Sequence, residues 1–144
     1  MILHAGLIAL QTAGAWQGIL LLGPSGAGKS DLTLRALDDG FQLVADDRTQ
    51  VFLSEGRLFG RAPKTLFGLM EIRGVGVAKV AARPFAPVTL AVRCKTTPGE
   101  VERLPDAMTE CFLGVETPAL DLWVLENSAP AKIRRAIEHL GPRP

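Results

Sequence analysis

The sequence predicts an α/β fold in which a mixed central sheet is flanked by helices. Two short apolar runs, Gly18–Leu22 and Phe41–Ala45, have the continuous apolar character of strands that are covered on both faces. Apolar residues at helical spacing lie between the two runs, and a second amphipathic helix is expected from Ser128 onwards. The α/β prediction therefore rests on two expected buried strands and two expected helices.

The length and composition predict one globular domain over residues 1–144. Apolar residues make up 47% of the 144 residues and charged residues 22%, which is ordinary for a folded domain and too apolar for a disordered chain. The 16 basic and 15 acidic residues leave a formal charge of +1. Such a balance gives no bulk attraction to nucleic acid or to an anionic membrane, so neither is expected as a partner.

The chain shows no sign of secretion or membrane insertion. No apolar run approaches the roughly 18 residues that span a bilayer. The start, Met1–His4, lacks the basic segment of a secretory signal. Cys94 and Cys111 form no C-x-x-C pair and are expected to be buried free thiols in a reducing compartment. We therefore expect a soluble, cytoplasmic protein.

The first 45 residues are expected to form a pair of strands, a helix and a further strand. Gly6–Gln11 and Gly18–Leu22 are the paired strands, and Thr12–Gln17 is the turn between them. Gly40 follows the helix at a position where glycine commonly ends one, and Phe41–Ala45 is the next strand. The apolar side of this helix consists of Leu32, Leu34, Ala36 and Leu37.

The rest of the chain alternates short strands with segments rich in glycine and proline. Pro63–Gly76 is predicted to be irregular, and Thr96–Glu110 to be an exposed loop. The last helix is expected to start after Ser128 as its cap and to end at Gly141 and Pro142. Further strands are expected at Val51–Leu53, Arg57–Phe59, Val88–Cys94 and Ala119–Leu125.

A phosphate-binding loop is indicated between the second predicted strand and the first helix. Glycines allow consecutive backbone N–H groups to turn inward around an anion, and the positive end of the helix dipole faces the same place. The lysine of such a loop reaches the β- and γ-phosphates, and the final hydroxyl binds Mg²⁺. The fold is therefore predicted to be a P-loop nucleotide-binding domain. The residues that match the pattern G-x-x-x-x-G-K-[ST] are Gly23, Pro24, Ser25, Gly26, Ala27, Gly28, Lys29 and Ser30.

Two carboxylates follow the strand Phe41–Ala45. In open α/β sheets ligands bind beyond the carboxyl ends of the strands, so Asp46 and Asp47 are expected near the phosphates. Because neighbouring strand residues point to opposite faces, one can address the reacting hydroxyl and the other a metal or a backbone group. Asp46 comes only 17 positions (46 − 29) after Lys29, which favours a kinase-like site with a proton-accepting carboxylate. The alternative is a turn that ends in two solvated acids.

Other polar groups are less specific when taken alone. Within Glu71–Gly76, Glu71 offers a metal ligand and Arg73 a cation for transferring oxygens. A surface salt bridge beside a turn explains this stretch equally well. His4 by itself is expected to be a structural or surface residue.

Taken in order, these motifs resemble the catalytic domain of bacterial HPr kinase/phosphorylase. The most specific of them is Leu69–Gly76, which contains the family signature Glu-Ile-Arg-Gly, and the resemblance covers residues 1–80 well and the remainder loosely. Because His4 lies almost at the first residue, the chain looks like a short, single-domain branch that lacks the N-terminal domain. The other matching segments are His4-Ala5, Gly23–Asp31 and Leu43–Arg48.

The resemblance implies an enzyme that uses ATP and Mg²⁺ to phosphorylate a serine of HPr, the phosphocarrier of the sugar phosphotransferase system. Many members also reverse the reaction with inorganic phosphate. Asp46 is then the proton acceptor, His4 lies beside this acid and tunes it, and Arg73 lies beside the incoming serine. Lys29 and the loop amides hold phosphate. A homo-oligomer, often a hexamer, is also implied. The residues implied at or near Mg²⁺ are Ser30, Asp47 and Glu71.

One departure and two alternatives stay open. Longer members of the family have a Pro-x-Arg-Pro-Gly loop that contacts substrate, where this chain reads Thr97–Pro105 and offers Arg103 as the replacement. The phosphorylase reaction and the mode of HPr docking are therefore open. A nucleotide-binding regulatory sensor without kinase activity is one alternative. A small-metabolite P-loop kinase is the other, although the sequence has no arginine-rich lid outside its last helix.

Overall fold

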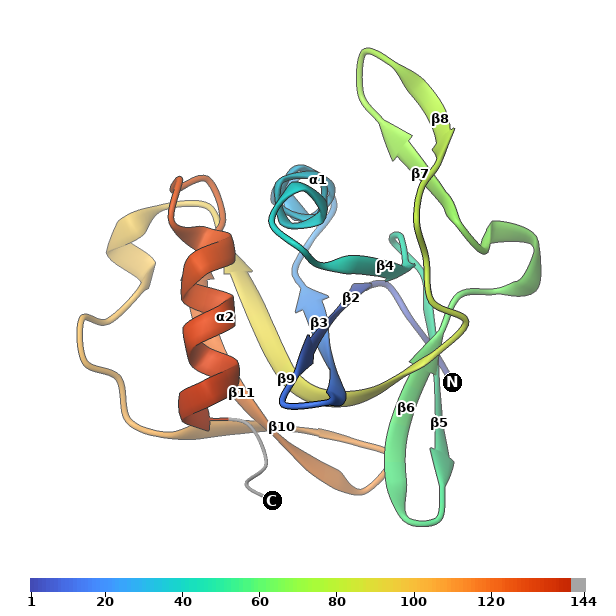
Figure 1. The fold of residues 1–144 in the computed structure, drawn as a ribbon. Helices are drawn as coiled ribbons and strands as arrows, with labels where there is room; N and C mark the ends of the chain where they lie inside the picture. The colour runs from blue at the N-terminus through green and yellow to red at the C-terminus, as the bar shows by residue number, and fades with distance from the viewer. Residues whose placement is uncertain (141–144) are drawn as a thin grey trace.

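The structure, a computed structural model, describes residues 1–140 and consists of a curled mixed sheet, two helices and a small separate hairpin (Figure 1). The helices are α1 (Lys29–Asp38) and α2 (Ala129–Leu140), and short 3₁₀ turns lie at Lys64–Leu66 and Pro98–Glu100. The strands are β1 (Ile2–Leu3), β2 (Gly6–Thr12), β3 (Ala15–Leu22), β4 (Gln42–Ala45), β5 (Thr49–Ser54), β6 (Arg57–Arg61), β7 (Leu69–Ile72), β8 (Gly76–Lys79), β9 (Ala86–Lys95), β10 (Met108–Phe112) and β11 (Val115–Trp123).

The direction of the strands brings four carboxyl ends to one edge of the sheet. The strand order is β1-β5-β6-β9-β3-β2-β4. β11 pairs with the C-terminal half of β9, on the side opposite to β3, and β10 pairs with β11. β3 runs parallel to β9, and β9 runs parallel to β11. β2 is antiparallel to both β3 and β4, so β4 points the same way as β3. The predicted α/β fold with a mixed sheet and flanking helices is confirmed, and α1 starts at the edge where these ends meet.

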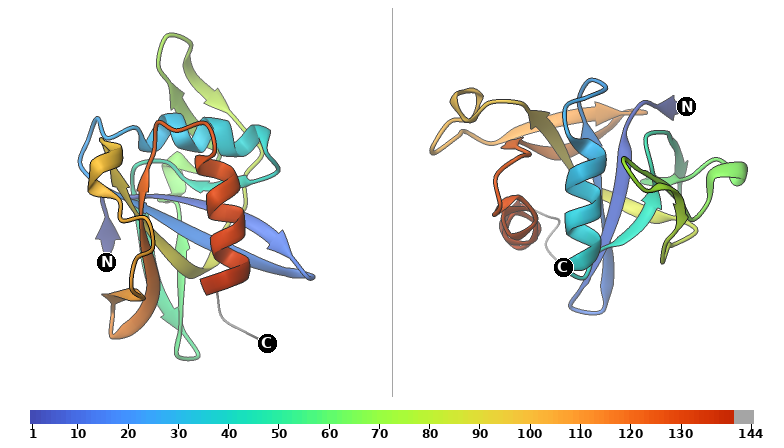
Figure 2. Two further views of the ribbon diagram at one scale, coloured as in Figure 1. Left: turned by 90° about the vertical axis from the view of Figure 1, so that its left-hand side faces the viewer. Right: turned by 90° about the horizontal axis from the view of Figure 1, so that it is seen from above.

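Apolar side chains fill both faces of the sheet. α1 and α2 cover one face (Figure 2), where Leu32 and Ile133 share a fully buried cluster with Ile19 of β3. The hairpin β5–β6 covers the other face, where Val51 is buried in one cluster with Leu20 of β3. β3 is thus enclosed on both sides, as its continuous apolar run predicted. The loop that leaves β3 is consequently supported by the most deeply buried part of the molecule.

The first hairpin is tighter than predicted. Strand β2 continues to Thr12 and β3 begins at Ala15, so the turn shrinks from Thr12–Gln17 to Ala13 and Gly14. These two residues have φ values of 49° and 80°, the left-handed backbone of a two-residue hairpin turn. The longer turn was wrong because Ala-Gly lacks the Asn-Gly or Asp-Gly signal that usually marks such turns.

Two segments that were predicted to be irregular contain strands. Pro63–Gly76 includes β7, which pairs with β8 in a separate two-stranded sheet, and the end of Thr96–Glu110 belongs to β10, which pairs with β11. β8 is mostly exposed, and β7 and β10 are only four and five residues long with a charged residue in each, so no continuous apolar run marks them. β1 was not predicted either, since it pairs with β5 through two residues.

The C-terminal helix starts directly after Ser128, as predicted, but the Ser128 side chain does not cap it. The Ser128 hydroxyl donates to Glu126 Oε1 (2.7 Å) instead of accepting from a helix N–H. Gly141 and Pro142, which were predicted to end the helix, lie outside the described residues. None of the helices within residues 1–140 is long and apolar enough to cross a membrane.

The two cysteines differ in exposure. Cys94 on β9 is buried, as predicted, whereas Cys111 on the outer strand β10 is exposed, so that part of the prediction was wrong. Both are free thiols. The edge position of β10 explains the difference, because alternate side chains of an edge strand that covers only one face point to solvent.

Candidate functional site

The segment Gly23–Ser30, called the cradle below, joins the carboxyl end of β3 to the first turn of α1. Gly28 starts the helix with a φ of 99°, and a Cβ added there would lie 2.9 Å from Val124 Cγ2. A Cβ added to Gly23, whose φ is 147°, would lie 3.3 Å from Cys94. Glycine accepts this backbone and this close approach at low cost. The ends of β9 and β11 therefore hold the cradle from behind.

Several backbone N–H groups of the cradle are available to an anion. The N–H of Ala27 donates to the carbonyl oxygen of Pro24 (3.1 Å), whereas those of Gly26, Gly28 and Ser30 have no acceptor among residues 1–140. The first N–H groups of any helix lack an acceptor within it, and the positive end of the helix dipole lies at the same point. The cradle therefore presents free donors and a positive potential together.

Lys29 carries a nearly buried charge inside the cradle. Its residue is 7% exposed, and its ammonium group donates to the carbonyl oxygens of Gly23 and of Pro24, the latter at 3.1 Å. A buried charge needs such partners, and here they come from the loop itself. Burial raises the pKa of the Cys94 thiol behind the cradle to about 12, although the Lys29 charge acts in the opposite direction. The thiol is therefore neutral and unreactive.

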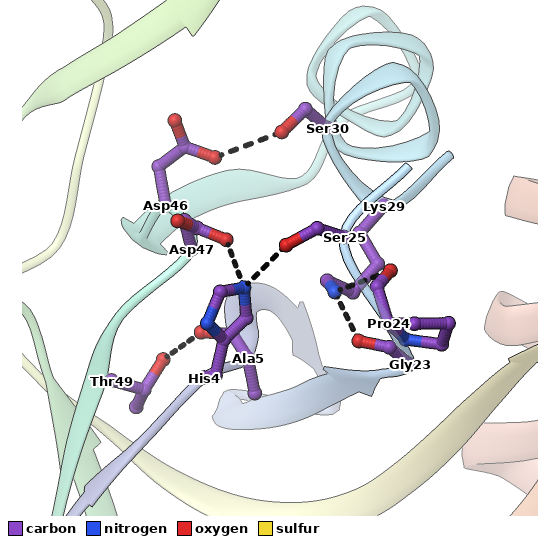
Figure 3. Close-up of polar contacts among 10 residues, drawn as sticks. All are labelled: His4, Ala5, Gly23, Pro24, Ser25, Lys29, Ser30, Asp46, Asp47 and Thr49. Atoms are coloured by element: carbon purple, nitrogen blue, oxygen red, sulfur yellow. Dashed lines mark hydrogen bonds and ion pairs between the residues drawn. The ribbon is translucent and has the colours of Figure 1, made fainter. Parts of the chain in front are cut away.

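Asp46 faces the cradle from the bend that follows β4. Its Oδ1 accepts a hydrogen bond from Ser30 Oγ (3.3 Å), and its Oδ2 accepts one from the N–H of Glu71 (3.1 Å) (Figure 3 shows the first). Burial raises the pKa of Asp46, the two hydrogen bonds oppose this, and the charges of Asp47 and Glu71 add to it. A raised pKa moves a carboxylate toward the range that suits a general base at neutral pH.

Asp47 turns away from Asp46 and meets the start of the chain. Its φ is 66°, and its Oδ1 lies 2.9 Å from Nε2 of His4, while Ser25 Oγ lies 3.2 Å from the same nitrogen (Figure 3). The resemblance placed His4 beside Asp46, but the structure places it against Asp47. Both aspartates follow β4 without continuing it, so strand alternation does not decide where they point.

Two supporting residues escaped the sequence analysis. The buried hydroxyl of Thr49 donates to the carbonyl oxygen of Ala5 (2.8 Å), which fixes the segment that carries His4 beside the aspartates. Arg35 donates to the carbonyl oxygens of Val124 and of Glu126, the latter at 3.0 Å, and so ties α1 to the end of β11. No local pattern signals the first contact. The spacing of Arg35 from Asp31 signals a helix pair but not the link to β11.

A cleft of about 410 Å³ opens between the cradle, the two aspartates and the hairpin β7–β8. His4 lies behind Ser25 and Asp47, and Arg103 is exposed and is not among the described residues that line the cleft. The predicted site residues that line it are Ser25, Gly26, Gly28, Lys29, Ser30, Asp46, Asp47, Glu71 and Arg73.

The oxygen groups of the cleft fit a Mg²⁺ ion that also binds phosphate. No group of three or more His, Cys, Asp and Glu side chains within residues 1–140 forms a metal cage. Mg²⁺ does not require one, because it commonly takes one or two protein carboxylates, substrate phosphates and water. Ser30 and Asp46 are in contact, and Asp47 and Glu71 line the same cleft. The predicted ligands Ser30, Asp47 and Glu71 could therefore hold the ion, while Asp46 lies beside them.

Comparison with known proteins identifies the family. The family described as HPr serine kinase C-terminal domain matches residues 2–133, which is nearly the whole chain. The chain belongs to this family. The family that the sequence resemblance indicated is thereby confirmed.

Curated HPr kinase relatives match part of their own length. The HPr kinase/phosphorylase of Limosilactobacillus reuteri (strain DSM 20016) is 37% identical over 116 residues, covering 73% of this chain and 36% of that protein. The HPr kinase/phosphorylase of Clostridium perfringens (strain SM101 / Type A) is 42% identical over 65 residues, covering 45% of this chain and 21% of that protein. The chain thus spans about a third, or less, of the relatives that it matches.

A solved structure supports the fold of the HPr kinase domain. The Hpr(Ser) kinase/phosphatase from Coxiella burnetii superposes with a TM-score of 0.80 at 25% identity, covering 96% of this chain and 89% of that one. The curled mixed sheet and both helices therefore belong to a known arrangement.

Proposed function

We propose that this domain transfers the terminal phosphoryl group of ATP to a serine of HPr. The observation that carries the proposal is the cleft in which the free N–H groups of the cradle and Lys29 face Asp46, whose Oδ1 is 3.3 Å from Ser30 Oγ. The family and the relatives named HPr kinase/phosphorylase support HPr as the acceptor.

The cradle supplies the phosphate site of this reaction. The N–H groups of Gly26, Gly28 and Ser30 donate to phosphate oxygens, and Lys29 exchanges its contacts with loop carbonyls for contacts with the β- and γ-phosphates. When Mg²⁺ is bound, it neutralises the charge that develops on the transferring oxygens. Ser30, with Asp47 and Glu71, would hold the ion.

Asp46 accepts the proton of the serine hydroxyl that receives the phosphoryl group. The serine oxygen forms a bond to the γ-phosphorus while the bond between that phosphorus and the oxygen of ADP breaks, and the serine proton passes to Asp46. In reverse, an oxygen of inorganic phosphate forms a bond to the phosphorus of phosphoserine while the bond from that phosphorus to the serine oxygen breaks. Asp46 returns the proton to the serine oxygen, and pyrophosphate leaves. Its raised pKa makes it a stronger base than an ordinary aspartate, and a positioned base of this kind contributes about 10²–10⁴ in rate.

The hairpin β7–β8 supplies the wall on the acceptor side. The N–H of Glu71 holds Asp46 Oδ2 at 3.1 Å, so the hairpin orients the base directly. Arg73 lies in the exposed turn of the hairpin and is among the residues that line the cleft. A cation at this position stabilises negative charge on the transferring oxygens.

Transfer of label from γ-³²P-ATP to purified HPr tests the proposal. We expect label in HPr, recovered as phosphoserine, that depends on Mg²⁺. Binding of ATP without label in HPr would contradict the proposal and favour a regulatory nucleotide sensor. Label in a small molecule of a metabolite mixture, and none in HPr, would favour a metabolite kinase. Adding inorganic phosphate to phospho-HPr tests the reverse reaction.

Assembly is a separate prediction. The resemblance implies a homo-oligomer, often a hexamer, and light scattering of the purified chain tests this directly. A monomeric mass at working concentration would overturn the oligomer while leaving the phosphotransfer proposal intact.

A further inference from the structure

The contacts among Asp47, His4 and Ser25 use a single ring nitrogen. Nε2 of His4 lies 2.9 Å from Asp47 Oδ1 and 3.2 Å from Ser25 Oγ (Figure 3). In a nucleophilic Ser-His-Asp triad the acid and the serine meet different nitrogens of the imidazole, so that a proton can leave the serine. Here no second nitrogen faces Ser25. This cluster therefore does not activate Ser25 as a nucleophile.

The chemistry of the carboxylate decides where the hydrogens lie. An ionised carboxylate only accepts hydrogen bonds, so a lone pair on Nε2 would repel Asp47 Oδ1 at 2.9 Å. Nε2 must therefore carry the hydrogen and donate it to Asp47. Ser25 Oγ, 3.2 Å from the same N–H, can then only accept from His4. The hydrogen of the Ser25 hydroxyl must consequently point elsewhere.

The position of Ser25 limits where that hydrogen can go. Ser25 is the third residue of the cradle and lines the cleft together with Gly26 and Lys29. His4, which contacts Ser25 Oγ, is not among the described residues that line the cleft. Because its oxygen accepts from His4, the hydroxyl keeps its own hydrogen free to donate to a group bound in the cleft that Ser25 lines.

We propose that the Ser25 hydroxyl donates a hydrogen bond to a bound phosphate and that His4 is the positioning residue that orients it. Asp47 in turn fixes the imidazole by accepting from Nε2. The segment that carries His4 is itself fixed, because Leu3 pairs with Thr49, whose hydroxyl donates to the carbonyl oxygen of Ala5 (2.8 Å). The proposal rests on the phosphate site of the proposed function, and it adds a side-chain donor to the backbone donors of the cradle.

The imidazole tautomer gives a direct test that requires no ligand. The chain has 2 histidines, so the variant His139→Asn leaves His4 as the single imidazole in long-range ¹H–¹⁵N spectra. His139 is exposed on α2, far from the cradle in sequence, which makes it a safe position to change. We expect neutral His4 to carry its hydrogen on Nε2. A hydrogen on Nδ1 would overturn the assignment.

Calorimetry with Mg²⁺ and the β,γ-imido analogue of ATP tests the binding role. A hydrogen bond to a charged group predicts roughly tenfold to a hundredfold weaker binding for Ser25→Ala. His4→Ala should weaken binding in the same direction, and His4→Gln should recover most of it, because the glutamine amide can donate near the position of Nε2. The matched control Ser54→Ala, at an exposed serine on β5, should bind like the wild type.

A double-mutant cycle separates orientation from folding. In the Ser25→Ala background, His4→Ala should weaken binding little further, because the hydroxyl that it orients is absent. Full additivity of the two changes, or wild-type affinity of Ser25→Ala, would overturn the proposal. These measurements contain no HPr, so they are independent of phosphotransfer. If HPr is not labelled but the cycle behaves as expected, the proposed function fails and this inference stands.

Discussion

The cradle is held by the centre of the sheet, whereas the hairpin β7–β8, which forms the opposite wall of the cleft, pairs mainly with itself. Gly23 and Gly28 pack directly against residues of β9 and just beyond β11. In β8, three of the four residues are exposed, and Met70 of β7 is the buried anchor of the hairpin. Figure 1 shows the hairpin extending away from the body of the molecule.

The difference assigns separate tasks to the two walls. A site for phosphate gains from rigid donors, because they need no rearrangement when the anion arrives. A wall that must admit a protein substrate gains from a less firmly packed element, and two-stranded hairpins have little stability of their own. The link between the two walls is Asp46, which accepts from Ser30 beside the cradle and from the N–H of Glu71 on the hairpin.

Amide hydrogen exchange should show the largest contrast between the two walls. Amides of the buried segment Ile19–Leu21 in β3 should open only with global unfolding, whereas those of β8 open locally. We expect protection factors that differ by about a thousandfold or more. Equal protection in the two elements would show that the hairpin is as firmly packed as the sheet, which would remove the basis of the comparison.

Removing one cation from each wall should show that ATP affinity depends on the cradle and not on the surface of the hairpin. Lys29→Ala should weaken binding of ATP roughly tenfold to a hundredfold, because a charge-assisted contact is lost. Lys79→Ala, an exposed position on β8, should leave ATP affinity unchanged in the same calorimetric titration. Unchanged affinity of a folded Lys29→Ala variant would contradict the assignment of the cradle.

Adding a methyl group to one glycine in each wall should compare packing at similar backbone strain. Gly28→Ala meets Val124 Cγ2 at 2.9 Å with a φ of 99°, whereas Gly74→Ala in the hairpin turn has a φ of 85° and no atom within 4 Å. We expect chemical denaturation to show about 2–4 kcal/mol lost for Gly28→Ala and about 1–2 kcal/mol for Gly74→Ala. Equal losses would mean that the cradle is not tightly held from behind.

The pH dependence of stability should reveal the raised pKa of Asp46. A carboxyl with a raised pKa binds its proton more tightly in the folded state, so its contribution to the free energy of unfolding falls as the pH rises through that window. As the pH rises from acid to neutral, the free energy of unfolding of the wild type, measured with urea, should therefore fall relative to that of Asp46→Asn. A rise in the relative free energy of unfolding of the wild type would mean that Asp46 has a lowered pKa.

The cradle could be predicted from sequence because each of its positions has a local stereochemical reason. Gly28 needs a positive φ, and the buried strand β3 and the helix α1 on either side are visible as patterns. The hairpin could not be predicted in this way. Leu69–Ile72 and Gly76–Lys79 are short, and β8 is mostly exposed, so the apolar spacing that marks a buried strand is absent.

The partner of His4 could not be predicted for another reason. The imidazole reaches Asp47 because β1 pairs with β5 through Ile2 and Leu3 alone. That pairing joins segments more than forty residues apart (49 − 3 = 46) and leaves no local pattern. The sequence therefore indicated which residues gather at the cleft, while the direction of each aspartate depended on the bend after β4.

The most direct test of the central claim compares Asp46→Asn with Asp38→Asn in single-turnover transfer from ATP to HPr. Asp38 is an exposed residue at the far end of α1 and serves as the matched control. We predict a rate at least about a hundredfold lower for Asp46→Asn, with ATP affinity close to that of the wild type, and no change for Asp38→Asn. Equal transfer rates for Asp46→Asn and the wild type would contradict the claim that Asp46 accepts the proton across the cleft.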